Sequence, residues 1–459
     1  VYVFDEGGTG FRSRDAGLTW QWLVHDSRAG EKDPPWLRIS DQPYIATSSI
    51  TFDPAVLDRL WLTAGTGVYY ADVSSSDYRV NWISQTRGIE ELVTYDVVHP
   101  TGGAPLFAAA DFGIHAKDDL NRFSTTYGPR ERVLIAAQQL DWSPSNPDFV
   151  VTNASDTRTF CCAEDGDAVM AGYSLDGGRQ WTKFPTLPTP PGTSGADPWR
   201  MSFGAIAVSA NSIDNIVWAP SYNRSPFYTL DRGRTWTRVS LPGEVLPLTG
   251  SHENLWIQRK TLAADRVRPG TFYLIHSGDG YNGGLRGLWR TTNGGASWER
   301  AFAGEIAPNS RWAAKLRAVP GQAGHLFFTS GVAGDGDTRL RRSTDGGSLW
   351  QILATVDRVD DIAFGKAAPG AAYPAIYLSG RVKGTYGIWR STDNATTWTR
   401  LSAFPLGTLD QVTVMEADKD TFGRVYVGYQ GSGWLYGEPS TCKPEPYRQT
   451  ADRECSSVN

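Results

Sequence analysis

The sequence predicts an all-β fold, a seven-bladed β-propeller built from four-stranded blades, and two kinds of repeat carry this prediction. An octapeptide of the form Ser/Thr-x-Asp-x-Gly-x-x-Trp occurs along the whole chain, in two copies with one substitution. Groups of four short β-like runs recur around these copies at intervals of roughly 45 to 60 residues. Repeats of this size, in which each small sheet hides its faces against its neighbours, are typical of propellers.

The octapeptides are Asp-boxes, and their chemistry is that of a tight turn. The Asp or Asn accepts backbone N–H bonds across the turn, the Gly supplies a positive φ, and the Trp starts the next strand and packs inward. Because this role explains every residue of the motif, we interpret the carboxylates as hairpin staples and not as catalytic groups. The copies are Ser13–Trp20, Ser174–Trp181, Thr229–Trp236, Thr291–Trp298 with Asn293, Ser343–Trp350, and Ser391–Trp398 with Ala395.

The four-run groups define the expected domain organisation, in which each blade has strands A to D. The seven predicted blades start near Ile50, Tyr95, Leu140, Ala205, Thr261, Leu316 and Asp361. We expect residues 1–45 to hold terminal strands with one Asp-box and a connector, 46–437 to form the propeller, and 438–459 to form a polar tail. Residues 1–24 and 411–437 supply three strands each. These extra strands either combine into an eighth blade or belong to a second lobe.

Composition excludes several classes of partner. The 44 basic and 49 acidic residues give a net charge of -5, which is too weak and too evenly spread for a nucleic-acid partner. No run approaches the roughly 18 apolar residues that span a membrane. The six His residues have no metal-ligand spacing, and no phosphate-binding or nucleophile-elbow motif occurs, so we expect no cofactor and no metal.

Several features favour a secreted, extracellular protein. The chain begins at Val1 inside a strand-like run, which is typical of a mature or cleaved product. Sequons stand at Asn153, Asn223 and Asn394. The cysteines, Cys161, Cys162, Cys442 and Cys455, have no metal-type spacing. Cys442 and Cys455 are close enough to close a small loop in the tail, and the pairing of the four stays open.

Propeller geometry points to one rim as the functional face. The D–A and B–C connections share that rim, and the Asp-box hairpins lie on the opposite one. The residues on those connections include one carboxylate, Asp111, and a set of aromatic side chains. Aromatic rings stack on the C–H faces of sugars, and a carboxylic acid can protonate a leaving oxygen, so a glycan groove is the favoured reading over simple rim packing. The aromatic candidates are Tyr44, Trp199, Tyr222, Trp256, Tyr281, Trp312 and Trp434.

Four stretches carry a resemblance to a known family. Gly88-Ile89-Glu90-Glu91 leads to Gly103-Ala104-Pro105-Leu106 and then to Asp111-Phe112-Gly113; the other three stretches are residues 361–370, 386–391 and 423–428. In this order they resemble the C-terminal propeller lobe of the family-74 glycoside hydrolases over roughly residues 46–437. The resemblance implies an endo-acting, inverting hydrolase of xyloglucan, a β-1,4-glucan with xylose branches, in which Asp111 is the general acid. Ala110 stands where that family has Gly.

Inversion needs a second carboxylate, and the resemblance places it in an N-terminal lobe for which this sequence has no equivalent. The base then comes from a missing lobe, or from the same rim. The same-rim candidates are Asp279, Asp335, Asp337 and Asp360. The alternative is a non-catalytic propeller that binds a glycan or a protein through this rim, and reducing-end release from xyloglucan separates the two.

Overall fold

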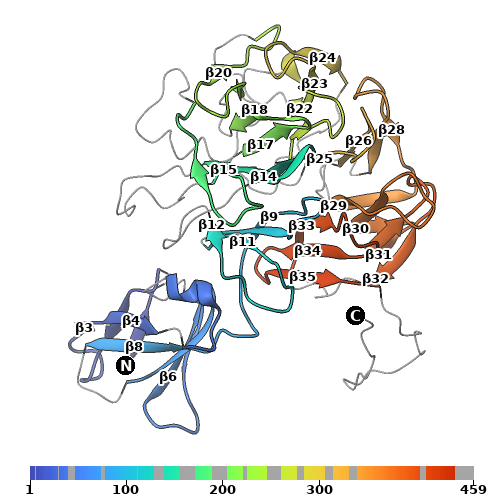
Figure 1. Ribbon diagram of the computed structural model, residues 1–459. Helices are drawn as coiled ribbons and strands as arrows, with labels where there is room; N and C mark the ends of the chain where they lie inside the picture. Colours follow the sequence, from blue (N-terminus) through green and yellow to red (C-terminus); the bar gives the residue numbers. More distant parts are fainter. Residues whose placement is uncertain are drawn as a thin grey trace.

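The structure, a computed structural model, is an all-β fold in which seven sheets form a closed ring (Figure 1). It describes residues 1–5, 7–28, 30–39, 47–73, 78–110, 112–128, 139–154, 171–188, 204–220, 225–244, 260–276, 284–304, 314–329, 339–403 and 410–439. In this part of the chain, no helix has the length and apolar character that crossing a membrane requires.

The first three blades of the ring each have four antiparallel strands in simple up-and-down order. Blade 1 consists of β9 (Thr94–Val98), β10 (Leu106–Ala109), β11 (Gly113–Ala116) and β12 (Tyr127–Gly128). Blade 2 consists of β13 (Leu140–Ser143), β14 (Asn146–Thr152), β15 (Gly172–Ser174) and β16 (Thr182–Lys183). Blade 3 consists of β17 (Gly204–Ser209), β18 (Ser212–Pro220), β19 (Phe227–Thr229) and β20 (Thr237–Arg238).

Blades 4 to 6 repeat this order, and blade 7 has three strands among the described residues. Blade 4 consists of β21 (Leu262–Ala264), β22 (Phe272–His276), β23 (Gly287–Thr291) and β24 (Glu299–Phe302). Blade 5 consists of β25 (Lys315–Ala318), β26 (Leu326–Thr329), β27 (Arg341–Ser343) and β28 (Gln351–Ile352). Blade 6 consists of β29 (Val356–Gly365), β30 (Ala375–Val382), β31 (Thr385–Ser391) and β32 (Thr399–Ser402). Blade 7 consists of β33 (Val412–Ala417), β34 (Val425–Tyr429) and β35 (Trp434–Gly437).

The ring closes where blade 7 meets blade 1. Strand β33 contacts β9. The Thr94 hydroxyl donates to the backbone oxygen of Tyr429 at 2.7 Å and lies 2.6 Å from the hydroxyl of Thr413. Strands such as β22 and β34 are buried along their whole length because other blades cover both of their faces. The seven-bladed propeller is therefore confirmed.

The Asp-box turns have the hydrogen bonds that the motif predicts. In each of the six, the Ser or Thr hydroxyl accepts the N–H of the residue four positions later, and the Asp or Asn accepts the N–H four positions after itself. Ala395 takes the position of the glycine with a φ of 63°. The inward packing of the tryptophan fails at one copy, because Trp20 is 46% exposed on the short strand pair before the ring.

Residues before the ring form a unit of two sheets, drawn in blue in Figure 1, that stands to one side of the blades. One sheet has β1 (Tyr2–Phe4), β2 (Gly10–Arg12) and β3 (Gln21–Trp22). The other has β4 (Val24–Arg28) paired in parallel with β8 (Arg79–Ser84), followed by β7 (Gly67–Asp72), β6 (Arg59–Ala64) and β5 (Ile50–Phe52). A 3-10 helix, η1 (Pro35–Ile39), follows β4.

This unit differs from the blade assignment made on the sequence. The strands from Ile50 were expected to be the first blade, but they pair with β4 outside the ring, and the strands from Val412 complete the ring instead. The first and last three-strand groups form separate sheets, so they do not combine into an eighth blade. The local strand pattern is the same in both places, and long-range contacts, such as those of Thr94, select the strands that close the ring.

One of the three sequons is not a surface site. Asn153 has no exposed area, its side-chain oxygen accepts the N–H of Gln139 at 2.9 Å, and its amide nitrogen donates to Gly204. A glycan on this side chain would break both bonds, so Asn153 carries no argument for an extracellular location.

Candidate functional site

Most of the side chains that the sequence singles out lie outside the described residues. These are the candidate acid, most of the aromatic candidates, three candidate bases and the cysteines: Asp111, Tyr44, Trp199, Tyr222, Trp256, Tyr281, Trp312, Asp279, Asp335, Asp337, Cys161, Cys162, Cys442 and Cys455. The described residues give the positions of Trp434 and Asp360, and they give the surroundings of position 111.

The two neighbours of position 111 are both anchored. Ala110 donates its backbone N–H to the carbonyl oxygen of Val93 at 2.8 Å. The ring of Phe112, which is 5% exposed, lies against the indole of Trp36 in η1, with centroids 4.6 Å apart. Gly113 follows with a φ of 77°, a conformation that favours glycine. The β10–β11 turn is therefore fixed to blade 1 on one side and to the unit before the ring on the other.

The segment from residue 88 to 92 joins three parts of the molecule at this point. Glu91 donates its N–H to the carbonyl oxygen of Thr66 in the unit before the ring, at 3.2 Å. Gly433, in the loop before β35 of blade 7, donates to the carbonyl oxygen of Leu92 at 2.9 Å. Glu90 accepts the N–H of Gly88 at 2.9 Å and so closes the turn at the start of the segment. The segment that carries part of the family resemblance thus holds the β10–β11 turn beside blade 7.

A cavity of about 520 Å³ lies between this segment, blade 1 and blade 7. That volume is in the range of small-molecule sites, which are commonly apolar clefts with a few polar groups. Its aromatic lining is Trp36, Phe107, Phe123, Trp434 and Tyr436, and its charged lining is Glu90, Glu91 and Lys117. Phe123 belongs to the connection between β11 and β12, so the cavity extends from the rim of the β10–β11 turn toward the Asp-box rim. Rings and carboxylates together are the combination that a sugar site requires.

Trp434 is the one aromatic candidate that the structure places, and it lies in the wall of this cavity. Its ring is partly buried and meets the ring of Phe107 edge-on, with centroids 5.4 Å apart. Its Nε1 is buried and has no hydrogen-bond partner among the described residues. The residue therefore packs between blades and also faces the cavity, and its role as a sugar subsite stays a prediction.

Sequence reasoning did not select two carboxylates that stand at this site. Partial burial, and then the charge of Asp410, raise the pKa of the exposed Glu91 carboxyl above its usual value. Asp410 accepts the N–H groups of Gly431 and Ser432, at 3.3 and 2.9 Å, and so shapes the loop that leads to Trp434. Glu91 lies within the Ile-Glu-Glu segment, so the sequence could have indicated it as a site residue. Asp410 is identified only by the folded loop.

Asp360 does not fit the role of a catalytic base. It is 3% exposed, and its carboxylate binds Arg358 at 3.0 Å, the hydroxyl of Ser379 at 3.2 Å and the hydroxyl of Tyr386. Burial raises its pKa, against the effect of Arg358 and the hydrogen bonds. A base must reach a water molecule on the substrate side, and this carboxylate is enclosed by its partners.

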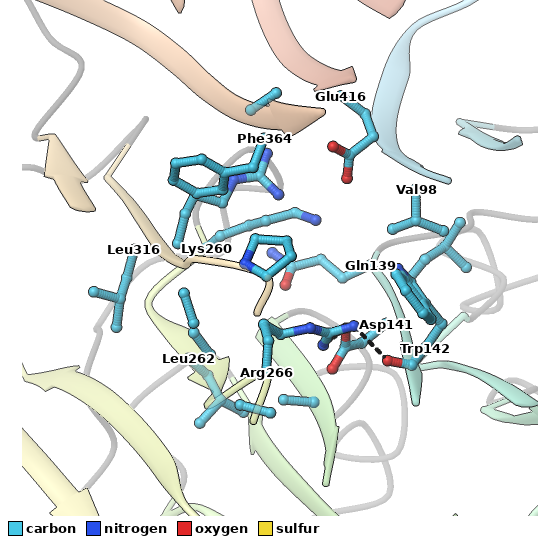
Figure 2. A pocket seen from close by; sticks show the side chains of 18 of the residues that line it. Val98, Gln139, Asp141, Trp142, Lys260, Leu262, Arg266, Leu316, Phe364 and Glu416 are labelled. Carbon is cyan, nitrogen blue, oxygen red and sulfur yellow. Dashed lines mark hydrogen bonds and ion pairs between the residues drawn. The ribbon is translucent and has the colours of Figure 1, made fainter. Parts of the chain in front are cut away.

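The propeller axis holds a second, smaller cavity of about 90 Å³, shown in Figure 2. Its charged lining residues all form ion pairs, either with one another or with a buried aspartate behind the wall: Lys260 with Asp96 at 2.5 Å, Arg266 with Asp141 at 2.8 Å, Arg317 with Asp361 at 2.6 Å, and Lys419 with Glu416 at 2.6 Å. The volume holds a few water molecules and lies below the range of ligand pockets.

The axial pairs join blades that are distant in sequence. The Asp361 carboxylate in blade 6 accepts from Arg317 in blade 5 and from the N–H of Met415 in blade 7. Burial opposes its charge, but Arg317 and Lys315 hold its pKa below the usual value. Burial lowers the pKa of Lys315 to about 8. Among the described residues, the charged groups at the axis are engaged with protein partners, so their role is to stabilise the ring.

One group of three side chains among the described residues has the proximity of a metal site, namely His99, Asp418 and Asp420. Its donor atoms are already engaged. Asp418 accepts from the Tyr426 hydroxyl at 2.8 Å and from Arg424 at 3.2 Å, and His99 Nδ1 accepts the N–H of Lys419 at 3.1 Å. A cation there would compete with a guanidinium for the same oxygen, so the trio gives no metal centre. The absence of metal chemistry stays a prediction.

No family model matches this chain. Among curated proteins, it is 29% identical over 469 residues to the xyloglucanase Xgh74A of Acetivibrio thermocellus, covering 96% of this chain and 49% of that protein. It is 28% identical over 452 residues to a xyloglucanase of a Paenibacillus species, covering 94% of this chain and 40% of that protein. The chain therefore spans about half the length of the curated relatives it matches.

Solved structures show the same relationship. The family-74 xyloglucanase of Xanthomonas campestris superposes with a TM-score of 0.68 at 27% identity, covering 94% of this chain and 55% of that one. The family-74 enzyme of Niastella koreensis superposes with a TM-score of 0.64 at 23% identity, covering 94% and 55%. The match extends over both the ring and the unit before it.

Proposed function

We propose that this chain is a family-74 glycoside hydrolase, as its similarity to the xyloglucanases supports, and that it takes part in hydrolysis of xyloglucan, with Asp111 as the general acid. The reaction is cleavage within a β-1,4-glucan chain that bears xylose branches, with inversion at the anomeric carbon. The acid protonates the leaving oxygen while a second carboxylate activates a water molecule on the opposite face of the sugar. No cofactor enters this scheme.

One observation supports this proposal above the others: the aromatic and acidic cavity shares part of its lining with the apolar cluster that anchors the β10–β11 turn. Trp36, Leu92 and Trp434 line the cavity, and the same three side chains belong to the apolar cluster that contains Ala109 and Phe112. A sugar bound in the cavity therefore lies beside the turn that carries position 111. Rings of this kind bind the apolar face of a pyranose and leave its hydroxyls for polar groups.

The second carboxylate comes, in our proposal, from a partner lobe. The unit before the ring packs against the β10–β11 turn through Trp36, and its Thr66 carbonyl accepts the N–H of Glu91. A partner lobe that binds to this unit would therefore lie on the same side as the cavity. Two carboxylates about 6.5–9.5 Å apart leave room for the attacking water. Asp279, Asp335 and Asp337 are the remaining same-rim alternatives, and Asp360 is removed by its burial.

We also propose that the protein acts outside the cell. A polysaccharide substrate does not cross a membrane, so an enzyme that cleaves it within the chain must meet it there.

The decisive experiment is release of reducing ends from xyloglucan. The 459-residue chain is assayed alone and mixed with the N-terminal half of a longer family-74 relative. Activity in either assay supports a hydrolase. Activity only after the N-terminal half is added shows that the partner lobe supplies the base. Binding of xyloglucan with no release in either mixture would replace the hydrolase by a glycan-binding propeller.

A further inference from the structure

Blade 6 has a long β30–β31 hairpin. Its strand β31 has seven residues, whereas the corresponding described strands of its two neighbours, β27 in blade 5 and β35 in blade 7, have three and four. Pairing between β30 and β31 continues to Val382 opposite Thr385, where a two-residue turn with positive φ at Lys383 and Gly384 closes the hairpin. This B–C turn is on the same rim as the β10–β11 turn. Blade 6 therefore forms a wall beside blade 7.

One face of this wall bears two arginines and a tyrosine side by side. Arg381 on β30 is opposite Arg358 on β29 and opposite Tyr386 on β31. Directly opposite residues share a face of the sheet, and so do residues two and four positions apart on one strand. Tyr377, four residues before Arg381, packs in the cluster with Met415 of blade 7. The two arginines consequently lie on the face that looks toward blade 7.

The positive charge on this face is only partly compensated. Arg358 binds Asp360 at 3.0 Å, and that carboxylate also accepts from Ser379 and Tyr386. Arg381 is exposed and has no hydrogen-bond or ion-pair partner among the described residues. The neighbouring Lys383 adds a further positive charge at the turn. Asp357, also on β29, accepts the N–H of Gly384 at 2.7 Å and so stabilises the turn.

Like charges placed directly opposite in a sheet destabilise it, so this arrangement calls for an external anion. A planar guanidinium binds a carboxylate through two parallel hydrogen bonds, and an adjacent aromatic ring can stack on a sugar. The wall faces blade 7, whose loop leads to Trp434 and the cavity. In the proposal below, the polysaccharide extends from the cavity across blade 7 to this face.

We propose that the Arg358, Arg381 and Tyr386 face is a subsite for the carboxylate of an acidic sugar unit in the polysaccharide. The ligand class is a glucan whose branches carry uronic acid residues. This inference rests on the proposed function, because it names a further substrate feature that the same rim recognises. Arg358 is held by Asp360 and sets the geometry, and the unpartnered Arg381 provides the principal contact.

The test compares two forms of one polymer. Xyloglucan and xyloglucan with part of its primary C6 hydroxyls oxidised to carboxylates are titrated into the full chain by calorimetry, at low and at high salt. We expect the oxidised form to bind about tenfold more tightly at low salt, and the ratio to fall at high salt because mobile ions screen exposed charges. Arg381→Gln should bring the ratio close to one, and Arg381→Lys should keep part of it. Arg234→Gln removes an equal charge from an exposed Asp-box turn on the opposite rim and should leave the ratio unchanged.

Each outcome decides the proposal. Equal affinity for both polymers, a preference that survives Arg381→Gln, or no binding of either polymer overturns the acidic-sugar subsite. Cleavage of neutral xyloglucan without any preference removes the subsite and leaves the hydrolase. A preference that depends on Arg381 without cleavage of either polymer retains the subsite and removes the hydrolase.

Discussion

The indole of Trp36 packs against the ring of Phe112, with centroids 4.6 Å apart, and so links the unit before the ring to the residue that follows position 111. Both side chains are almost fully buried, at 3% and 5% exposure. The contact is the main apolar anchor between η1 and the β10–β11 turn. It places the candidate catalytic turn at a junction between two units, where a small displacement would alter the distance to any group on the other side.

Removing this anchor should impair hydrolysis. Truncation of a buried Trp commonly costs about 3–5 kcal/mol, and the turn loses the surface against which it is fixed. We expect Trp36→Ala to lower kcat at least about tenfold, because a misplacement of about 1 Å is expensive in catalysis. Trp36→Phe, which keeps a ring at the contact, should retain most of the activity. Unchanged kcat in Trp36→Ala, measured on protein that circular dichroism shows to be folded, would contradict this role.

The hydrogen bonds of the Asp-box turns could be predicted from the sequence because they are local, whereas the exposure of Trp20 could not. Each hydroxyl and carboxylate binds N–H groups within four residues, as Ser174 does with Gly178. The identity of the closing blade could not be predicted in this way. The strands near Ile50 and near Val412 have similar local patterns, and the choice between them depends on contacts such as that between Thr94 and Thr413, which are 319 residues apart.

The candidate site was predictable only in part. The functional rim follows from strand order, and the position of Trp434 in a cavity wall agrees with that reasoning. The partners of Glu91 and Trp36 come from other units of the fold, so no spacing in the sequence indicates them. The burial of Asp360 could not be predicted either. Its carboxylate binds side chains from three different strands of blade 6, namely Arg358, Ser379 and Tyr386.

The Asp-box carboxylates should make stability depend on pH in the acid range. Hydrogen bonds from the Thr19 side chain and N–H lower the pKa of Asp15 to about 2, and bonds from Thr235 and Thr229 outweigh burial to lower that of Asp231 to about 2. A lowered folded-state pKa stabilises the fold above the unfolded value of 3.8, and the effect is lost as pH falls through 2. We therefore expect the melting temperature to fall between about pH 4 and pH 2.

An asparagine variant checks this assignment. Blade 4 already uses Asn293, whose side-chain oxygen accepts the N–H of Ser297 at 2.9 Å. Asp231→Asn should therefore fold with a similar melting temperature at pH 7 and show a smaller decrease between pH 4 and 2. Scanning calorimetry of both proteins measures the difference. An identical acid decrease in the variant would mean that other carboxylates dominate.

The axial ion pair of Arg317 and Asp361 should contribute to stability and not to chemistry. The two groups are 2.6 Å apart, and the Asp361 side chain has no exposed area. Removal of one partner of a buried pair leaves the other charge unpaired and commonly costs about 3–5 kcal/mol. We expect Asp361→Asn to lower the free energy of unfolding by about that amount in urea denaturation. The kcat of the folded variant should be unchanged, and a selective loss of kcat would show that the axis takes part in the reaction.

The central prediction concerns Asp111, and its control lies in the same protein. If Asp111 protonates the leaving oxygen, Asp111→Asn should lower kcat for xyloglucan by about 10²–10⁴, because the amide occupies the same space but has no proton to transfer. Affinity for xyloglucan oligosaccharides should change by less than about twofold, since the rings of the cavity are intact. Asp176→Asn makes the same chemical change in an Asp-box on the opposite rim, where the Asp176 carboxylate accepts the N–H of Gln180 at 2.8 Å. That control should keep its kcat. Equal activity of Asp111→Asn and the control, assayed in whichever mixture releases reducing ends, would show that the acid is a different group on this rim.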